Sequence, residues 1–293
     1  MQTHIADRSI RLGGGPTGFL LIHGLGGTPG EMRYIAQGLA QAGYTVHVSR
    51  LAGHCGSVED LMCTRWADWY ESVEDEHRLI REKCDTVVVG GLSMGAILAL
   101  HHAARHPQDV SALALYAPPL WLDGWSVPWY SSVFRLLTQK WLADYIVERD
   151  PWGIGDSRSR ALVEKAITGG DGSQVGAPAV PGSLIPELRW LLRCVQREVG
   201  HVRQSALIVH PRSDDRATLR NLDYLQSNLG GLTQTVVLDE PHTVPRDRQC
   251  QLLLDRTLEF VVQLGQKTPN PIDREDVLSP IEKEDILDWL HGR

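Results

Sequence analysis

Ser93 has the sequence surroundings of a catalytic nucleophile. It lies in the pentapeptide GLSMG (91–95), which follows the apolar run TVVV and precedes the helix-forming run AILALHHAA. A strand, a sharp turn and a helix in this order expose a serine hydroxyl above the edge of a sheet, and the glycines leave room where backbone segments meet. G-x-S-x-G alone is a weak pattern, but in this setting it predicts a serine that attacks a carbonyl carbon.

A serine hydroxyl is a poor nucleophile at neutral pH, so it needs a general base and an acid that orients the base. Beyond residue 205, the apolar run ALIVH leads into PRSDDRATL, and the run QTVVL leads into DEPHTVPRD. Sites on open parallel sheets form beyond the C-terminal ends of the strands. We therefore predict Asp214 as the acid and His242 as the base, and we prefer Asp214 to its neighbour Asp215.

The negative charge that develops on the substrate oxygen needs fixed hydrogen-bond donors, often worth about 3 kcal/mol each. The backbone N–H of Met94 is one candidate, because it begins the helix after Ser93, where unpaired amides favour an anion. The second candidate is the amide of Leu25, in the glycine-bearing loop HGLGGTPGE (23–31) after the run FLLI. An ordinary strand-to-helix turn would need the same glycines, so that alternative stays open.

The elements that must position these residues follow an alternating pattern. Short apolar runs predict strands buried on both faces, and helix-like segments lie between most of them. This alternation predicts an α/β fold with a mainly parallel, doubly wound sheet. The expected strands cover 18–22, 44–48, 86–90, 112–116, 206–210 and 234–238, and the expected helices cover 30–42, 66–83, 94–106, 217–228 and 246–264.

The interval 118–205 is far longer than one crossover helix requires. We interpret it as an inserted helical cap, or lid, interrupted by a flexible segment; a second independent domain is the alternative. The core then comprises 1–117 and 206–266. Six of the nine tryptophans lie in the interval, and Trp121, Trp125 and Trp129 are the predicted substrate-binding residues. They line an apolar tunnel for an acyl or aryl group, or they form the core of the cap.

The C-terminal segment 267–293 is an acidic tail. Prolines mark a linker, and Ser279, Pro280 and Glu282 occupy the positions that begin a short helix. Ile286, Trp289 and Leu290 lie on one face of that helix. The tail packs either on its own body or on a neighbouring subunit, so a homodimer formed through the cap or the tail is one alternative.

Composition excludes several functions. The net charge is −7 and no basic stripe is present, which argues against nucleic-acid binding. The absence of a signal peptide and of a membrane span favours a cytoplasmic protein. Five cysteines without a CxxC pair indicate reduced thiols. We expect no metal and no organic cofactor, because neither a cluster with ligand spacing nor a phosphate-binding loop is apparent.

Together these motifs resemble the α/β-hydrolase superfamily, and more narrowly its carboxylesterase and monoacylglycerol lipase branch. The matching segments are LLIHGLGGTPGEM, LAGHCGSVEDL, GGLSMGA, HPRSDD and PHTVPRD. The resemblance implies Ser93, Asp214 and His242 as the triad, with Leu25 and Met94 as oxyanion donors. It also supports Asp214, which follows His210 by four residues as in the family's HG-x-x-D. Pro211 and Pro241 depart from the family pattern.

The expected function is hydrolysis of carboxylic esters, with a short- to medium-chain acyl group or a monoacylglycerol-like substrate, through an acyl-enzyme. A thioesterase, an amidase or a carbon–carbon bond hydrolase would use the same triad, and fold analogy does not separate these reactions. A non-catalytic protein that binds a small ligand is the alternative from another class. The complete Ser/Asp/His set argues against it.

Overall fold

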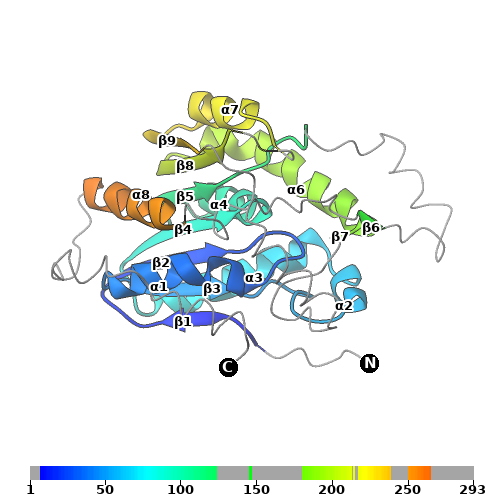
Figure 1. The fold of residues 1–293 in the computed structure, drawn as a ribbon, viewed down its shortest axis with the longest axis horizontal. Helices are drawn as coiled ribbons and strands as arrows, with labels where there is room; N and C mark the ends of the chain where they lie inside the picture. Colours follow the sequence, from blue (N-terminus) through cyan, green and yellow to red (C-terminus); the bar gives the residue numbers. More distant parts are fainter. Residues whose placement is uncertain are drawn as a thin grey trace.

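The computed structural model describes residues 7–123, 145–146, 180–212, 214, 217–238 and 250–264. Its centre is a seven-stranded sheet in the order β1-β3-β2-β4-β5-β8-β9 (Figure 1). Every pair of neighbours is parallel except β1 and β3. The strands are β1 Ile10–Leu12, β2 Thr17–Ile22, β3 Thr45–Ser49, β4 Thr86–Leu92, β5 Ala112–Tyr116, β8 Ser205–Pro211 and β9 Thr233–Leu238.

Helices cover both faces of this sheet. One face carries α3 (Trp66–Arg81), α4 (Met94–Arg105), α6 (Ile185–Glu198) and α7 (Arg220–Asn228), whose apolar residues share one core cluster. The other face carries α1 (Arg33–Gln41) and α8 (Cys250–Gln263), which contribute to a second cluster. The described residues therefore form three layers, helix on sheet on helix, which confirms the predicted α/β class.

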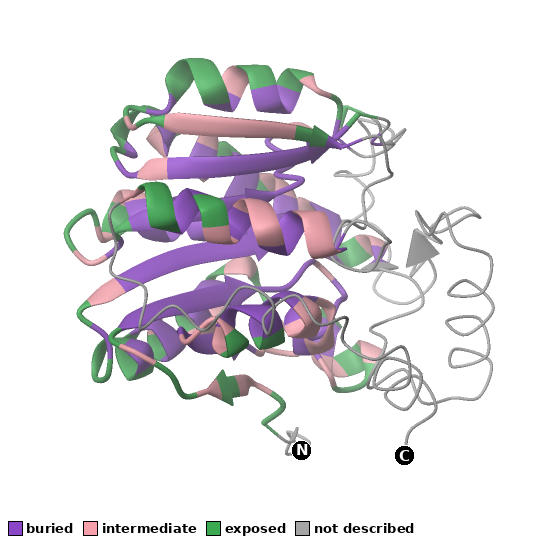
Figure 2. Ribbon diagram, turned by 60° about the vertical axis from the view of Figure 1, so that its left-hand side comes forward, coloured by how far each residue is buried: buried purple, intermediate pink, exposed green. Residues whose placement is uncertain are grey.

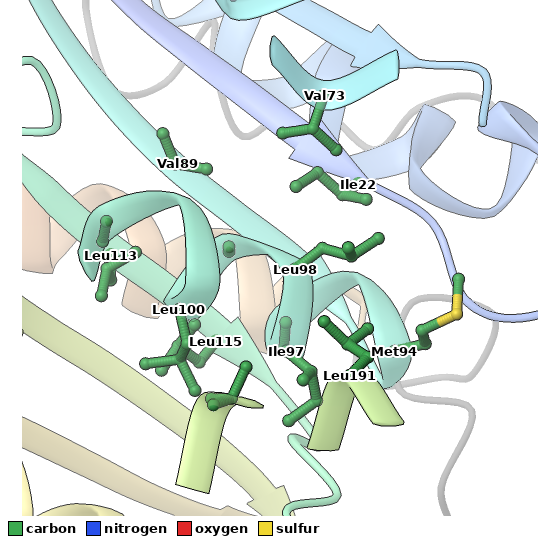
Figure 3. Packing of buried hydrophobic residues seen from close by; sticks show 14 of the residues in the cluster. Ile22, Val73, Val89, Met94, Ile97, Leu98, Leu100, Leu113, Leu115 and Leu191 are labelled. Carbon is green, nitrogen blue, oxygen red and sulfur yellow. The ribbon is translucent and has the colours of Figure 1, made fainter. Parts of the chain in front are cut away.

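The strands have both faces buried, as their continuous apolar runs predicted. Along β2, Leu20 and Ile22 belong to the cluster under α3 and α4, whereas Phe19 and Leu21 belong to the cluster under α1 and α8. All four side chains are fully buried. Figure 2 shows this burial along the central strands, and Figure 3 shows α4 packed between the strands and Leu191 of α6.

All six predicted strands are present, and β1 is an additional one. It is three residues long and antiparallel at the edge of the sheet, too short to show a periodic pattern. The described residues also form a short helix, α2 (Val58–Met62), and three short 3₁₀ helices, of which η1 (Pro29–Met32) adjoins the loop after β2.

The described part of the interval 118–205 includes α6, which packs against α4 and α3. It also includes the two-stranded pair β6 (Tyr145–Ile146) and β7 (Val180–Pro181). The other residues of the predicted cap, 124–144 and 147–179, lie outside the described residues, as does the tail from residue 265.

Candidate active site

Ser93 occupies the turn between β4 and α4. Its backbone has φ 53° and ψ −118°, a conformation that residues other than glycine rarely adopt. The Ser93 amide donates to the carbonyl oxygen of Tyr116 on β5 at 2.8 Å, and the Ser93 carbonyl accepts from the amide of Ala96 at 2.9 Å. These bonds tie the turn to the neighbouring strand and to the helix, so the surroundings hold a backbone conformation that is costly by itself.

The two glycines of the pentapeptide are required by close backbone packing. A β-carbon on Gly91 would lie 2.5 Å from the carbonyl carbon of Gly95 and 2.7 Å from the carbonyl oxygen of Ile22. A β-carbon on Gly95 would overlap the Ile22 carbonyl oxygen and lie 2.7 Å from that of His23. The first turn of α4 thus packs directly on the end of β2, which brings Ser93 next to the loop that follows β2.

The loop after β2 reaches Ser93 through Gly24. A β-carbon on Gly24 would lie 3.7 Å from the Leu92 carbonyl oxygen and 3.9 Å from the Ser93 β-carbon. The Gly24 amide donates to Oε2 of Glu31 at 3.0 Å, and the Gly26 amide donates to Nε2 of His54 at 3.2 Å. The Leu25 amide lies between these two bonded amides, and within residues 7–123 no acceptor is found for it.

His23 and His54 hold the loop after β2 against the loop after β3. The Nδ1–H of His54 donates to the Ala52 carbonyl at 3.0 Å, which leaves Nε2 to accept from Gly26. His23 is bonded in the same way, donating from Nδ1 to the Gly24 carbonyl at 2.9 Å and accepting at Nε2 from the Leu51 amide at 3.3 Å. Each ring thus has the hydrogen-bond pattern of a neutral imidazole.

Burial enforces the neutral state of His54. The ring is 2% exposed and packs edge to face on His23, with ring centroids 4.9 Å apart. Loss of solvation, with a smaller contribution from His23, lowers the pKa of His54 to about 3. His54 is therefore neutral at pH 7, where its Nε2 accepts a hydrogen bond from the Gly26 amide of the loop.

Asp214 lies beyond the C-terminal end of β8, on the same side of the sheet as Ser93, which follows the C-terminal end of β4. β4 and β8 are both parallel neighbours of β5, so their C-terminal ends meet there. The Asp214 side chain is fully buried. Its Oδ1 accepts from the Ala217 amide at 3.1 Å, and its Oδ2 lies 3.7 Å from Nε2 of His210. His210 itself donates from Nε2 to the Ala217 carbonyl at 2.8 Å.

The structure describes only some of the other predicted site residues. Met94 is buried at the start of α4, where the first amides of a helix have no partner within it (Figure 3). His242, Asp215, Trp125 and Trp129 lie outside the described residues. Their predicted roles therefore remain predictions.

Trp121 packs against α7. Its ring contacts Tyr224 edge to face with centroids 4.6 Å apart, and the Arg220 guanidinium lies 4.9 Å above it. The Trp121 amide donates to Oδ1 of the buried Asn221 at 2.7 Å. Asp123 then accepts two hydrogen bonds from Thr218, at 2.9 Å and 2.7 Å, so the segment after β5 is bonded to the segment that follows Asp214.

Glu31 and His54 are functional candidates that we did not predict individually from the sequence. Both lie in segments that carry the family resemblance, but their partners are backbone amides distant along the chain or across a turn, which composition does not reveal. In the described part of the chain, no three His, Cys, Asp or Glu side chains converge as metal ligands would. Nor is any helix described there both long and apolar enough to span a membrane.

Comparison with known protein families assigns most of the core to one family. The family described as serine aminopeptidase, S33, matches residues 18–223, which contain Ser93, Asp214 and the loop after β2. The match covers more than half of the chain. It ends before His242 and the C-terminal tail.

Two curated relatives match a shorter stretch. A thermostable monoacylglycerol lipase of a Bacillus species is 47% identical over 93 residues, or 32% of this chain and 37% of that protein. A carboxylesterase of Bacillus subtilis is 32% identical over 97 residues, or 33% of this chain and 39% of that protein. The matched stretch thus spans less than two-fifths of either relative.

Solved structures of similar fold cover nearly the whole chain. One of the metagenome-derived lipolytic enzymes LipS and LipT superposes with a TM-score of 0.72 at 22% identity, covering 88% of this chain and 98% of that one. The monoacylglycerol lipase of Paleococcus ferrophilus gives 0.68 at 15% identity, covering 88% and 99%. At this level of identity, these similarities establish the fold.

Proposed function

Since the chain belongs to the serine aminopeptidase S33 family of α/β hydrolases, we propose that it is a serine hydrolase that cleaves carboxylic esters. The observation that carries this proposal is the backbone of Ser93, held with φ 53° in the turn between β4 and α4. A serine in this strained, partly exposed turn, beside a glycine loop, has the geometry of an activated nucleophile.

In the proposed reaction, the Ser93 hydroxyl oxygen attacks the ester carbonyl carbon while His242 takes its proton. Asp214 orients the imidazole and stabilises it when it is charged. The carbonyl oxygen becomes negative in the tetrahedral intermediate and accepts from the amides of Leu25 and Met94. Collapse expels the alcohol with the proton from His242 and leaves an acyl-enzyme, which water hydrolyses by the same steps.

The choice of an ester is supported by the two curated relatives, whose names describe a monoacylglycerol lipase and a carboxylesterase. We propose a short- to medium-chain acyl ester or a monoacylglycerol-like ester as the substrate. The same triad would serve a thioester, an amide or a carbon–carbon bond, so the leaving group must be established by assay.

The test compares wild type with Ser93→Ala on p-nitrophenyl esters of graded chain length, alongside covalent labelling by a fluorophosphonate. Ser227→Ala is the matched control, because Ser227 is exposed on α7 and its hydroxyl donates to the Asp223 carbonyl of its own helix. We expect wild type and the control to hydrolyse and to label, and Ser93→Ala to do neither. A wild-type protein that neither hydrolyses nor labels would refute the proposal.

A substrate panel then assigns the bond. Matched acyl groups are presented as oxygen esters, thioesters and anilides, and a β-diketone is added. We expect the highest kcat/KM for the oxygen esters. A higher value for any of the other three would replace the ester assignment while leaving Ser93 as the nucleophile.

A further inference from the structure

The carboxylate of Glu31 is bonded to the loop that adjoins Ser93. Glu31 lies in η1, directly after the loop, and its side chain is half-buried. Oε2 accepts the Gly24 amide at 3.0 Å, and Gly24 is itself buried beside the Ser93 β-carbon. Hydrogen bonds to an ionised acceptor are among the stronger and more directional ones in proteins. The bond therefore restrains the part of the loop that is nearest to Ser93.

Gly27 provides the space that this carboxylate occupies. A β-carbon on Gly27 would lie 2.5 Å from Oε1 of Glu31 and would overlap the rest of the carboxylate. Gly27 does not have a positive φ, so the absence of a side chain here serves packing and not backbone conformation. The loop thus has both a hydrogen bond to the Glu31 carboxylate and a site shaped to admit it.

His54 restrains the same loop two residues further on. Its Nε2 accepts the Gly26 amide at 3.2 Å, and the ring is fixed by its bond to Ala52 and by contact with Trp69 at 6.1 Å between centroids. The amides on both sides of Leu25 are therefore held by side-chain acceptors. A peptide unit between two fixed neighbours has little freedom to rotate.

We propose that Glu31 is a positioning residue for catalysis: it fixes Gly24 so that the Leu25 amide is presented to the carbonyl oxygen of the substrate at Ser93. The inference rests on the proposed hydrolase function and adds a residue outside the triad to it. Glu31 acts through the loop backbone and does not touch the substrate. Its loss should therefore weaken the stabilisation of the transition state more than the binding of the ground state.

The first experiment measures kcat and KM of Glu31→Ala and Glu31→Gln on a p-nitrophenyl ester. Complete loss of a fixed oxyanion donor lowers kcat by about 100- to 1000-fold, and a shift of about 1 Å in the position of such a group can lower the rate by about 100-fold. We expect a kcat loss of that size in Glu31→Ala with KM changed by less than about threefold, and recovery of most of the loss in Glu31→Gln, whose amide oxygen can accept from Gly24. Unchanged kcat in Glu31→Ala, or no recovery in Glu31→Gln, overturns the proposal.

The second experiment displaces the carboxylate without removing it. Gly27→Ala should move the flexible end of Glu31 and lower kcat as Glu31→Ala does. In the double variant the two effects should not add, because the added methyl group then has no carboxylate to displace. Fully additive losses would show that the two residues act separately, contrary to the proposal.

The control is Glu82→Ala. Glu82 is an exposed glutamate between α3 and the N-terminal end of β4, whereas Ser93 follows the C-terminal end of that strand. Its replacement should therefore leave kcat unchanged. Thermal unfolding of each variant separates a loss of fold from a loss of positioning. A wild-type protein without activity or fluorophosphonate labelling refutes the hydrolase proposal itself, whereas an active wild type with an unimpaired Glu31→Ala refutes only the role of Glu31.

Discussion

Gly95 and Ile22 pack so closely that a β-carbon on Gly95 would overlap the Ile22 carbonyl oxygen. This contact joins the helix after the nucleophile to the strand before the glycine loop. It explains why the two segments predicted to provide oxyanion donors, one beginning with Met94 and one containing Leu25, adjoin each other although about seventy residues separate them in the sequence.

Gly95→Ala is expected to separate these segments. The added methyl group meets backbone atoms of Ile22 and His23, which cannot rotate away, so α4 must shift. Overpacking of this kind costs about 1–3 kcal/mol. We expect a lower free energy of unfolding in urea and a lower kcat. Gly200→Ala is the control, because a β-carbon there meets nothing within 4 Å, and it should leave both quantities nearly unchanged.

The sequence allowed the main sheet to be predicted because its strands are buried on both faces. A continuous apolar run such as TVVV is typical of a strand that is buried on both faces, and β4 begins within it as expected. β1 was not predicted, because its three residues are half-buried or exposed. Its position in the sheet depends on hydrogen bonds to a residue outside the strand. That residue is Glu76 of α3, which binds Arg11 by two hydrogen bonds of 2.7 Å.

The candidate site was predictable only where its determinants are local. Ser93 was predicted to be the nucleophile because strand, turn and helix are contiguous in the sequence, and its backbone has the strained conformation that such a turn requires. The restraint of the glycine loop by His54 depends on a contact across 28 residues. Contacts between these two loops arise because β2 and β3 are neighbours in the sheet. Residue spacing in the sequence does not predict them.

The choice between Asp214 and Asp215 as the acid can be tested by two matched substitutions. Asp214→Asn keeps the volume and an oxygen that can accept from the Ala217 amide. It removes the charge that stabilises the imidazolium, and replacing a triad acid in this way lowers kcat by about 10⁴-fold. We expect that loss in Asp214→Asn and a nearly wild-type kcat in Asp215→Asn. The reverse result would transfer the role to Asp215.

The ion pair between Arg11 and Glu76 should stabilise the edge strand β1. The Glu76 side chain is 5% exposed, and it also lies 2.7 Å from Nδ1 of His47. Burial alone would raise the pKa of Glu76, but the bonds from His47 and Arg11 outweigh it and hold that pKa below its ordinary value of 4.5. The stabilisation is therefore present above pH 4.5 and is lost as the pH falls through the lower folded-state pKa.

Arg11→Met should lower the free energy of unfolding at pH 7 by about 1–3 kcal/mol, because it leaves the buried carboxylate with fewer donors. The deficit relative to wild type should shrink below pH 4.5, where the carboxyl becomes protonated in the unfolded chain. Arg78→Met is the control on the same helix as Glu76. Its pair with Asp75 is exposed on both sides and should contribute less than about 1 kcal/mol. Equal losses in the two variants would contradict the prediction.

Three histidines pack together between α3 and α4. The ring of His102 lies 4.4 Å from that of His77 and 4.5 Å from that of His106, measured between centroids. His77 and His102 are buried, and within the described residues the Nε2 atom of each has no hydrogen-bond partner. Burial, reinforced by the neighbouring imidazoles, lowers the pKa of His77 to about 4 and that of His102 to about 2.

These two histidines should make the fold sensitive to acid. Between pH 6.5 and 4 the unfolded chain binds protons that the buried rings do not, so stability is complete above pH 6.5 and falls with pH, by at most about 1.4 kcal/mol per pH unit for each ring. Urea unfolding of His102→Leu at pH 7.5 and pH 5 should show a smaller difference than wild type. The exposed His201, replaced in the same way, is the control. An unchanged difference in His102→Leu would place the acid sensitivity elsewhere in the chain.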